Sequence, residues 1–156
     1  MRVLFMCTAN SCRSILSEAM FNHLAREGFE AVSAGSFPKG QVLPRSLTTL
    51  QQAGISIDGL YSKGNDAFEG NPPDIVITVC DKAAGETCPV YFGPAIKCHW
   101  GLEDPSEVKG DEATVDAAFH ATLMRIGQRC QAFLDLPFHS LSRDQLKAEL
   151  DRVGTL

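Results

Sequence analysis

The segment Asp74–Val79 constrains the fold most, because almost every residue in it is apolar and most are β-branched. A strand that is apolar on both faces belongs to a sheet that is covered on both sides, as the parallel sheets of α/β proteins are. Three further segments have the composition of short strands, namely 2–6, 30–34 and 95–100. Three other segments have helical periodicity, namely 15–27, 44–53 and 114–134. This alternation predicts an α/β fold with a mainly parallel, four-stranded sheet.

The composition of the 156-residue chain predicts a single soluble domain. A hydrophobic share of 44% with 21% charged residues excludes wholesale disorder. No apolar run approaches the ~20 residues of a membrane helix, and the net charge of −5 argues against binding to nucleic acid or to an anionic membrane. The chain contains six cysteines, and its start has the pattern of a strand and not of a signal peptide. These features predict a reducing compartment, the cytoplasm.

The predicted fold gathers three reactive side chains at one edge of the sheet. Ligands of open α/β sheets bind outside the carboxyl ends of the strands. Cys7 follows the first predicted strand, Cys80 follows the third, and Asp104 lies just beyond the fourth. We therefore expect these three side chains at the same rim.

The loop between the first strand and the first helix has the pattern of an oxyanion site. Its backbone N–H groups can converge on a tetrahedral anion at the positive end of the helix dipole, and Arg13 can add a two-pronged grip. The same field is expected to lower the pKa of Cys7 and make it a nucleophilic thiolate, with the Ser14 hydroxyl donating to the sulfur. The predicted cradle consists of Thr8, Ala9, Asn10, Ser11, Cys12, Arg13 and Ser14, with Asn10 in a left-handed turn. The plain alternative is a buried strand-end thiol beside a surface arginine.

Two motifs of the chain resemble those of a known family. The loop reads Cys-Thr-Ala-Asn-Ser-Cys-Arg-Ser at 7–14, and Val-Ser-Ala-Gly follows at 32–35. Together they are similar to the low-molecular-weight tyrosine phosphatase superfamily, and the Asn-Ser-Cys-Arg-Ser ending resembles its arsenate reductase branch. The resemblance implies a flavodoxin-like core with three layers, α/β/α, around a parallel sheet of four strands.

The resemblance runs from Arg2 to about Leu134. It implies a phosphatase-like arsenate reductase domain at 1–136 and a C-terminal extension at 137–156 that is not a separate domain. We expect the extension to be helical, because Ser142-Arg143-Asp144-Gln145 fits a capping box that opens a helix ending near Arg152. Docking on the core and binding of a partner both remain open.

The resemblance also implies a relay of three thiols. Cys7 would attack arsenate, Cys80 would attack Cys7 and release arsenite, and Cys88 would attack Cys80 to leave a Cys80–Cys88 disulfide. It further implies thioredoxin as the external electron donor and no bound cofactor, with a glutaredoxin–glutathione route still open. We expect a monomer.

Helix geometry sets a condition on this relay. If residues 80–88 were helical, the ends of the segment would lie about 12 Å apart, whereas a disulfide needs Cα atoms within ~4.4–6.8 Å. The segment must therefore bend or unwind on oxidation. We expect faster amide exchange across 81–87 in the oxidised protein.

The candidate general acid follows the fourth predicted strand. Asp104 precedes Pro105, which biases the aspartate to an extended backbone, and its carboxyl can donate a proton to a leaving oxygen. Glu103 is the nearby competitor. Where phosphatase relatives commonly carry a tyrosine, this chain has Ser106 and Glu107, which disfavours a phosphotyrosine substrate.

A cation site is implied by some reductase relatives, which bind potassium near the loop through asparagine, glutamate, serine and aspartate. Asn10, Glu18 and Ser33 match the first three. Where the aspartate is expected, this chain has Lys63. We predict that the Lys63 ammonium replaces the ion, so that potassium does not stimulate activity.

The other thiols receive less specific roles. Cys98 is a second candidate for the resolving thiol, placed after Cys88 because strand residues are usually packed. A zinc site of Cys80, Cys88, Cys98 and His99 is disfavoured, because it lacks a tight Cys-x2-Cys pair and neighbours in a strand point oppositely. We predict no metal. The remaining thiols are expected to be structural, namely Cys12 and Cys130.

Two other functions remain open. One is a phosphomonoesterase of the low-molecular-weight tyrosine phosphatase type, and the other is a non-catalytic thiol protein that senses arsenic or redox state. A reductase needs all three relay thiols, whereas a phosphatase works without Cys80 and Cys88. A sensor turns over nothing.

Overall fold

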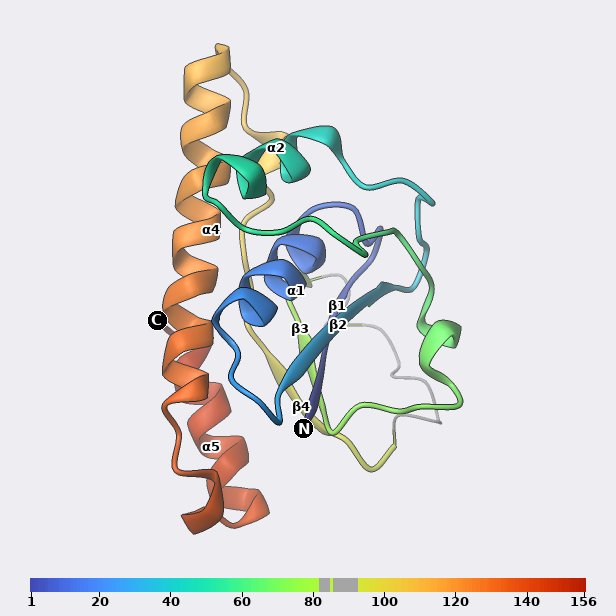
Figure 1. Cartoon of the computed structure of the whole chain (residues 1–156), viewed down its shortest axis with the longest axis vertical. Helices are drawn as coiled ribbons and strands as arrows, with labels where there is room; N and C mark the ends of the chain where they lie inside the picture. The colour runs from blue at the N-terminus through green and yellow to red at the C-terminus, as the bar shows by residue number, and fades with distance from the viewer. Residues whose placement is uncertain (82–84, 86–92) are drawn as a thin grey trace.

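The sheet has four parallel strands in the order β2-β1-β3-β4 (Figure 1). The computed structural model describes residues 1–81, 85 and 93–156, so that Cys88 lies outside the described residues. The strands are β1 (Arg2–Cys7), β2 (Glu30–Gly35), β3 (Ile75–Thr78) and β4 (Ile96–His99). Every neighbouring pair is parallel, which confirms the α/β fold expected from the alternation of strands and helices.

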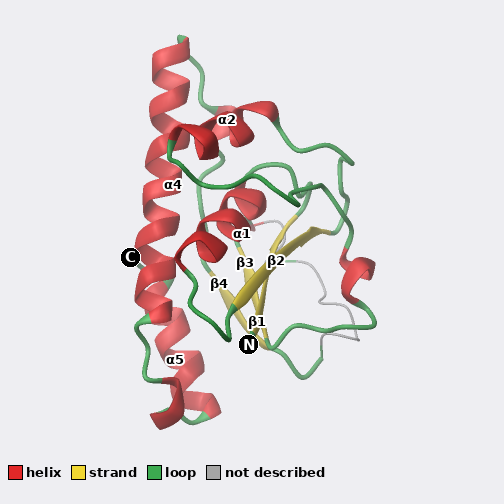
Figure 2. Cartoon of the chain, viewed as in Figure 1, coloured by secondary structure: helices red, strands yellow, loops and turns green. Residues whose placement is uncertain are grey.

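The helices fall on the segments that the periodicity predicts (Figure 2). They are α1 (Arg13–Leu24), α2 (Pro44–Gln52), α4 (Glu112–Leu134) and α5 (Arg143–Val153), with the one-turn helices η1 (Asn65–Phe68), η3 (Pro105–Glu107) and η4 (Phe138–Ser140). No helix in the described ranges is both long and apolar enough to cross a membrane.

Helix α1 ends three residues before the expected position, Glu27. Ala25 already has an extended backbone, with φ −65° and ψ 140°. The next residue, Arg26, instead donates to the Leu134 carbonyl at 2.7 Å and lies 4.5 Å from the centre of the Phe29 ring. Tertiary contacts of the arginine therefore replace a last helical turn.

Alternate residues of β1 face two different hydrophobic clusters. Val3, Phe5 and Cys7 belong to the larger cluster, to which α1, α2, α4 and α5 contribute, whereas Leu4 and Met6 face the opposite side. Within the described residues, that opposite side is covered by Phe68 of η1 and not by a long helix. Among the residues that the structure describes, the one-turn helix η1 is therefore the helical element that packs on this side of the sheet.

The C-terminal extension docks on the core, which answers the question that its sequence left open. Its helix α5 begins with the expected capping box at Ser142 and Gln145. Leu150 and Val153 are fully buried, and the Trp100 indole Nε1 donates to the Leu150 carbonyl at 3.0 Å. Figure 1 shows α5 beside the lower end of α4. This packing supports our proposal that 137–156 is not a separate domain.

Gly35, at the end of β2, allows the loop after β1 to pass close by. A Cβ atom at this position would lie 2.4 Å from the Thr8 carbonyl oxygen and 3.0 Å from the Asn10 amide nitrogen. Both neighbours are backbone atoms, so neither can swing away. The absence of a side chain at Gly35 therefore helps to set the shape of the candidate oxyanion loop.

We predict that Gly35→Ala distorts this loop and weakens phosphate binding by about tenfold or more, measured by titration calorimetry. The matched control is Gly70→Ala, because a Cβ at Gly70 meets nothing within 4 Å. Equal phosphate affinity of both variants and the wild type would contradict the role of Gly35.

Candidate active site

The candidate nucleophile lies at the carboxyl end of the central strand β1. Cys7 is the last residue of β1, is only 6% exposed, and is followed by the loop that leads into α1. Asn10 has φ 48°, which confirms the predicted left-handed turn. The residue before α1, Cys12, makes no side-chain cap, so the first amides of the helix are not capped from that position. Such amides are the usual ligands of an oxyanion at a helix N-terminus.

The buried Asn10 side chain holds the loop through three hydrogen bonds. Its Nδ2 donates to the hydroxyls of Ser14 at 2.8 Å and of Ser33 at 3.0 Å. Its Oδ1 accepts from the Lys63 backbone N–H at 2.9 Å. The Ser14 hydroxyl oxygen is thus an acceptor for Asn10, and its donation to the Cys7 sulfur stays a prediction.

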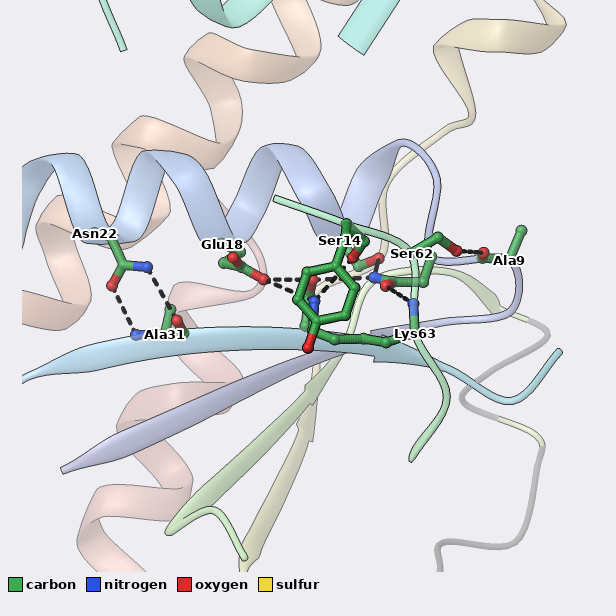
Figure 3. Close-up of polar contacts among 10 residues, drawn as sticks. Ala9, Ser14, Glu18, Asn22, Ala31, Ser62 and Lys63 are labelled. Atoms are coloured by element: carbon green, nitrogen blue, oxygen red, sulfur yellow. Dashed lines mark hydrogen bonds and ion pairs between the residues drawn. The ribbon is translucent and has the colours of Figure 1, made fainter. Parts of the chain in front are cut away.

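Lys63 ends this network with a nearly buried ion pair (Figure 3). Its ammonium lies 3.5 Å from Glu18 Oε1 and donates to the Tyr61 carbonyl at 3.0 Å, and the two charged side chains are 8% and 11% exposed. Burial lowers the pKa of Lys63, and the Glu18 carboxylate opposes that shift. Ser33 donates to the same Glu18 oxygen at 2.6 Å. This geometry supports the prediction that the Lys63 ammonium takes the place of the potassium ion that the family resemblance implies.

A second thiol lies against the nucleophile. Cys80 follows β3, is 3% exposed, and its side chain forms a hydrogen bond with that of Cys7. The Thr8 hydroxyl also contacts the Cys80 sulfur at 3.7 Å. The sequence thus correctly predicted Cys7 and Cys80 at one rim, whereas the contact with Thr8 gives no signal in the sequence.

The pKa of Cys7 is raised, not lowered as the loop alone predicts. The hydrogen bond with Cys80 is the largest cause, and burial is the next. Arg13 and the Thr8 backbone N–H act in the expected direction and lower the pKa of Cys7, but they do not outweigh the other two. The contact with Cys80 therefore favours the protonated form of Cys7.

Arg13 and Asp104 meet on the other side of the site. The guanidinium donates from Nη1 to the Leu102 carbonyl at 3.1 Å and lies 3.4 Å from Asp104 Oδ2 through Nη2. Asp104 has the extended backbone expected before a proline, and its Oδ1 accepts from the amide and hydroxyl of Ser106 at 2.9 and 2.6 Å. Glu103 is exposed. The contact with Arg13 places Asp104, and not Glu103, beside the candidate oxyanion loop.

A cavity of about 630 Å³ opens at this rim. Its lining includes residues from the loop, the Cys80 segment and the acid segment, namely Thr8, Arg13, Cys80, Asp81, Leu102 and Asp104. The cavity is large enough for a small oxyanion and lies where the carboxyl ends of the strands meet.

A chain of three polar side chains next to Cys80 was not predicted from the sequence. His99 Nδ1 contacts the Thr78 hydroxyl at 2.8 Å, and His99 Nε2 contacts Asp81 Oδ1 at 3.0 Å. Thr78 and His99 are paired in register at the ends of β3 and β4. The contact between Thr78 and His99 could have been predicted from this register, but only if the pairing of β3 with β4 had been known.

The other three described thiols, Cys12, Cys98 and Cys130, are all buried. Burial raises the pKa of Cys98 to about 12. Two charged residues of α5 have smaller effects on this pKa: Lys147 lowers it and Asp151 raises it. Burial raises the pKa of Cys12 to about 11 and also raises that of Cys130. These positions favour structural roles. In ranges 1–81 and 93–156, with residue 85, no group of three His, Cys, Asp or Glu residues is arranged to hold a metal.

We predict that Cys80→Ala lowers the pKa of Cys7, because the largest cause of its elevation is removed while Arg13 remains. The rate of Cys7 alkylation by iodoacetamide near neutral pH should then rise by about tenfold or more, which corresponds to a shift of at least one pKa unit. Peptide mapping assigns the label, and Cys98→Ala is the matched control. An unchanged pH profile of alkylation in Cys80→Ala would contradict the coupling.

We predict that Lys63→Met lowers the free energy of unfolding by about 3 kcal/mol, because Glu18 loses its nearly buried partner. Urea unfolding measures this change, with the exposed Lys109→Met as control. The wild type should unfold identically in potassium and sodium chloride, whereas Lys63→Asp should gain stability in potassium. Stabilisation of the wild type by potassium would refute the replacement of the ion by Lys63.

Comparisons with known proteins place these residues in a family. Residues 2–150 match the family described as "Low molecular weight phosphotyrosine protein phosphatase". The chain is 31% identical over 133 residues to an arsenate reductase of Bacillus subtilis and 32% identical over 133 residues to one of Bacillus licheniformis; each match covers 85% of this chain and 94% of the relative.

Solved structures give the same result. "An arsenate reductase in the phosphate binding state" superposes with a TM-score of 0.71 at 25% identity, covering 85% of this chain and 95% of that one. A thioredoxin-dependent arsenate reductase of Corynebacterium glutamicum superposes with a TM-score of 0.58 at 26% identity, covering 83% and 61%. The chain therefore belongs to the low molecular weight phosphotyrosine protein phosphatase family, within which it is similar to arsenate reductases.

Proposed function

We propose that this protein reduces arsenate to arsenite with Cys7 as nucleophile and Cys80 and Cys88 as a thiol relay. The hydrogen bond between Cys7 and Cys80 is the observation that carries the proposal. Hydrolysis of a phosphate ester needs one nucleophile and one acid. A second thiol in contact with the nucleophile is suited to attack a sulfur, which is redox chemistry. The arsenate reductases among the relatives support this assignment.

The first step forms a sulfur–arsenic bond. Arsenate binds in the loop from Thr8 to Ser14, where the amides and Arg13 balance its charge. Arg13 and the Thr8 backbone N–H, which lower the pKa of Cys7, favour its thiolate, and this thiolate attacks arsenic. A hydroxyl of arsenate leaves as water with a proton from Asp104. Arsenic remains As(V) in this step.

The second and third steps move two electrons. The Cys80 thiolate attacks the Cys7 sulfur, the S–S bond forms, and the electron pair of the S–As bond stays on arsenic, which leaves as arsenite. The Cys88 thiolate then attacks the Cys80 sulfur and releases Cys7 as a thiolate. The balance is two thiols oxidised to one disulfide for one As(V) reduced to As(III). Cys88 lies outside the described residues, so its place in the relay rests on the family resemblance.

An external dithiol must reduce the resulting disulfide. We propose thioredoxin, a proposal supported by the thioredoxin-dependent reductase of Corynebacterium glutamicum among the structural relatives. We propose a cytoplasmic location, because a relay of reduced thiols needs a reducing compartment. We also propose a monomer without a bound cofactor, because none of the steps above uses a cofactor or a residue of a second subunit.

Phosphomonoester hydrolysis is the second candidate function. Cys7, Arg13 and Asp104 form the set that such a reaction needs, and Arg13 contacts Asp104 directly. The Cys80 contact favours reduction over hydrolysis, because hydrolysis of a phosphate ester does not use a second thiol.

We predict that Cys80→Ser and Cys88→Ser each lower the multiple-turnover rate of arsenate reduction, followed as NADPH oxidation with a thioredoxin system, by at least about 100-fold. Both variants should retain hydrolysis of p-nitrophenyl phosphate. Cys98→Ala serves as the control and should keep both activities.

Three results would contradict this account. Sustained reduction by either relay variant would exclude the relay, and efficient phosphate hydrolysis without arsenate reduction in the wild type would identify a phosphatase. A wild type that binds arsenate but turns over neither substrate would identify a sensor.

A further inference from the structure

We propose that Arg129 of α4 is a positioning residue that, together with the C-terminal extension, holds the acid segment Leu102–Asp104 against the active site. The role of Asp104 as the acid in this inference rests on the proposed function. Arg129 itself lies far from the oxyanion loop in sequence, on a helix that contributes no residue to the mechanism above.

Arg129 is a charged residue in an unusual place. Its side chain is only 4% exposed. It donates from Nη1 to the Gly101 carbonyl at 3.1 Å and from Nε to a main-chain oxygen of Leu156 at 3.2 Å. No aspartate or glutamate side chain of the described residues forms an ion pair with it. Because burial of a charge is costly, a guanidinium that binds two main-chain oxygens there indicates that those two contacts matter.

The carbonyls of two successive residues face arginines from two different helices. The Gly101 carbonyl accepts from Arg129 of α4, and the Leu102 carbonyl accepts from Arg13 of α1 at 3.1 Å. The Leu102 amide donates to the Val79 carbonyl at 3.0 Å, which joins the acid segment to the chain leading to Cys80. The peptide group between Gly101 and Leu102 is thus held at its carbonyl by Arg129 and at its amide by Val79.

The extension completes the support. Trp100 donates from its indole Nε1 to the Leu150 carbonyl at 3.0 Å. A Cβ on Gly154 would lie 2.7 Å from the His99 carbonyl oxygen and 2.8 Å from Trp100 Cδ1, so the end of α5 packs directly on the chain before the acid segment. Residues 99–101 are therefore clamped between β3, α4 and the extension.

The consequence concerns the proton donor. Asp104 lies three residues beyond Gly101 and contacts Arg13 through its carboxylate. A shift of the acid segment by about 1 Å is enough to misplace a catalytic group and slow a reaction by orders of magnitude. The extension thus affects the rate indirectly: Leu156 binds Arg129, and Arg129 holds the acid segment in place.

The test compares Arg129→Met and Arg129→Lys with the control Arg152→Met, which removes an exposed arginine of α5. We expect Arg129→Met to lower kcat for arsenate reduction about tenfold with little change in KM, and Arg129→Lys, which keeps one charged donor, to restore part of the rate. In an Asp104→Asn background, Arg129→Met should have no further effect, because the two residues act as one unit.

A second measurement does not depend on the activity. Hydrogen exchange at the Leu102 amide should accelerate about tenfold in Arg129→Met, while amides of β1 stay protected and Arg152→Met behaves as the wild type. Unchanged exchange at Leu102 would overturn the proposal. So would rate losses that simply add in the double variant, because these indicate a general loss of stability. If the wild type reduces no arsenate, the proposed function fails, and the exchange measurement still decides the role of Arg129.

Discussion

The contact between the two sulfurs depends on the pairing of β1 with β3. Met6 and Thr78 are partners in register, and the pairing continues one residue further, because the Val79 amide donates to the Met6 carbonyl at 2.9 Å. Two adjacent parallel strands therefore end at almost the same level. Cys7 is the last residue of β1, and Cys80 lies two residues beyond the end of β3. The hydrogen bond between Cys7 and Cys80 favours the protonated form of Cys7, whereas the Arg13 guanidinium favours its thiolate.

Three structural elements hold the site from different directions. Asn10 ties the oxyanion loop to β2 through Ser33, and the Lys63–Glu18 pair closes this network from behind. On the opposite side, contacts from α4 and α5 fix the segment that carries the acid. We expect the first support to be independent of the ionic composition of the solution, because the cation beside Glu18 is the ammonium of Lys63.

Much of this arrangement follows from local sequence patterns. The apolar run of β3, the capping box of α5 and the extended backbone before Pro105 are set by residues close in sequence, and each was predicted correctly. The positions of Cys7 and Cys80 at one rim follow from the rule that parallel strands end on the same side.

Features that depend on tertiary contacts could not be predicted in this way. The pKa of Cys7 was expected to fall, because the loop alone lowers it, and the opposing effect of Cys80 exists only once β1 and β3 pair. The helical pattern of α4 identified its apolar face, but Arg129 on the same helix is buried too, since carbonyls far away in sequence accept its hydrogen bonds. The early end of α1 has the same origin, a long-range contact of Arg26.

A single turnover without an external reductant tests the central claim most directly. Reduced protein is mixed with excess arsenate, released arsenite is measured, and the disulfide is located by mass spectrometry of digested protein. The account predicts one arsenite per chain, the loss of two free thiols, a disulfide between Cys80 and Cys88, and a free Cys7. Arsenite release with all thiols still free, or a final disulfide that leaves Cys80 unpaired, would contradict it.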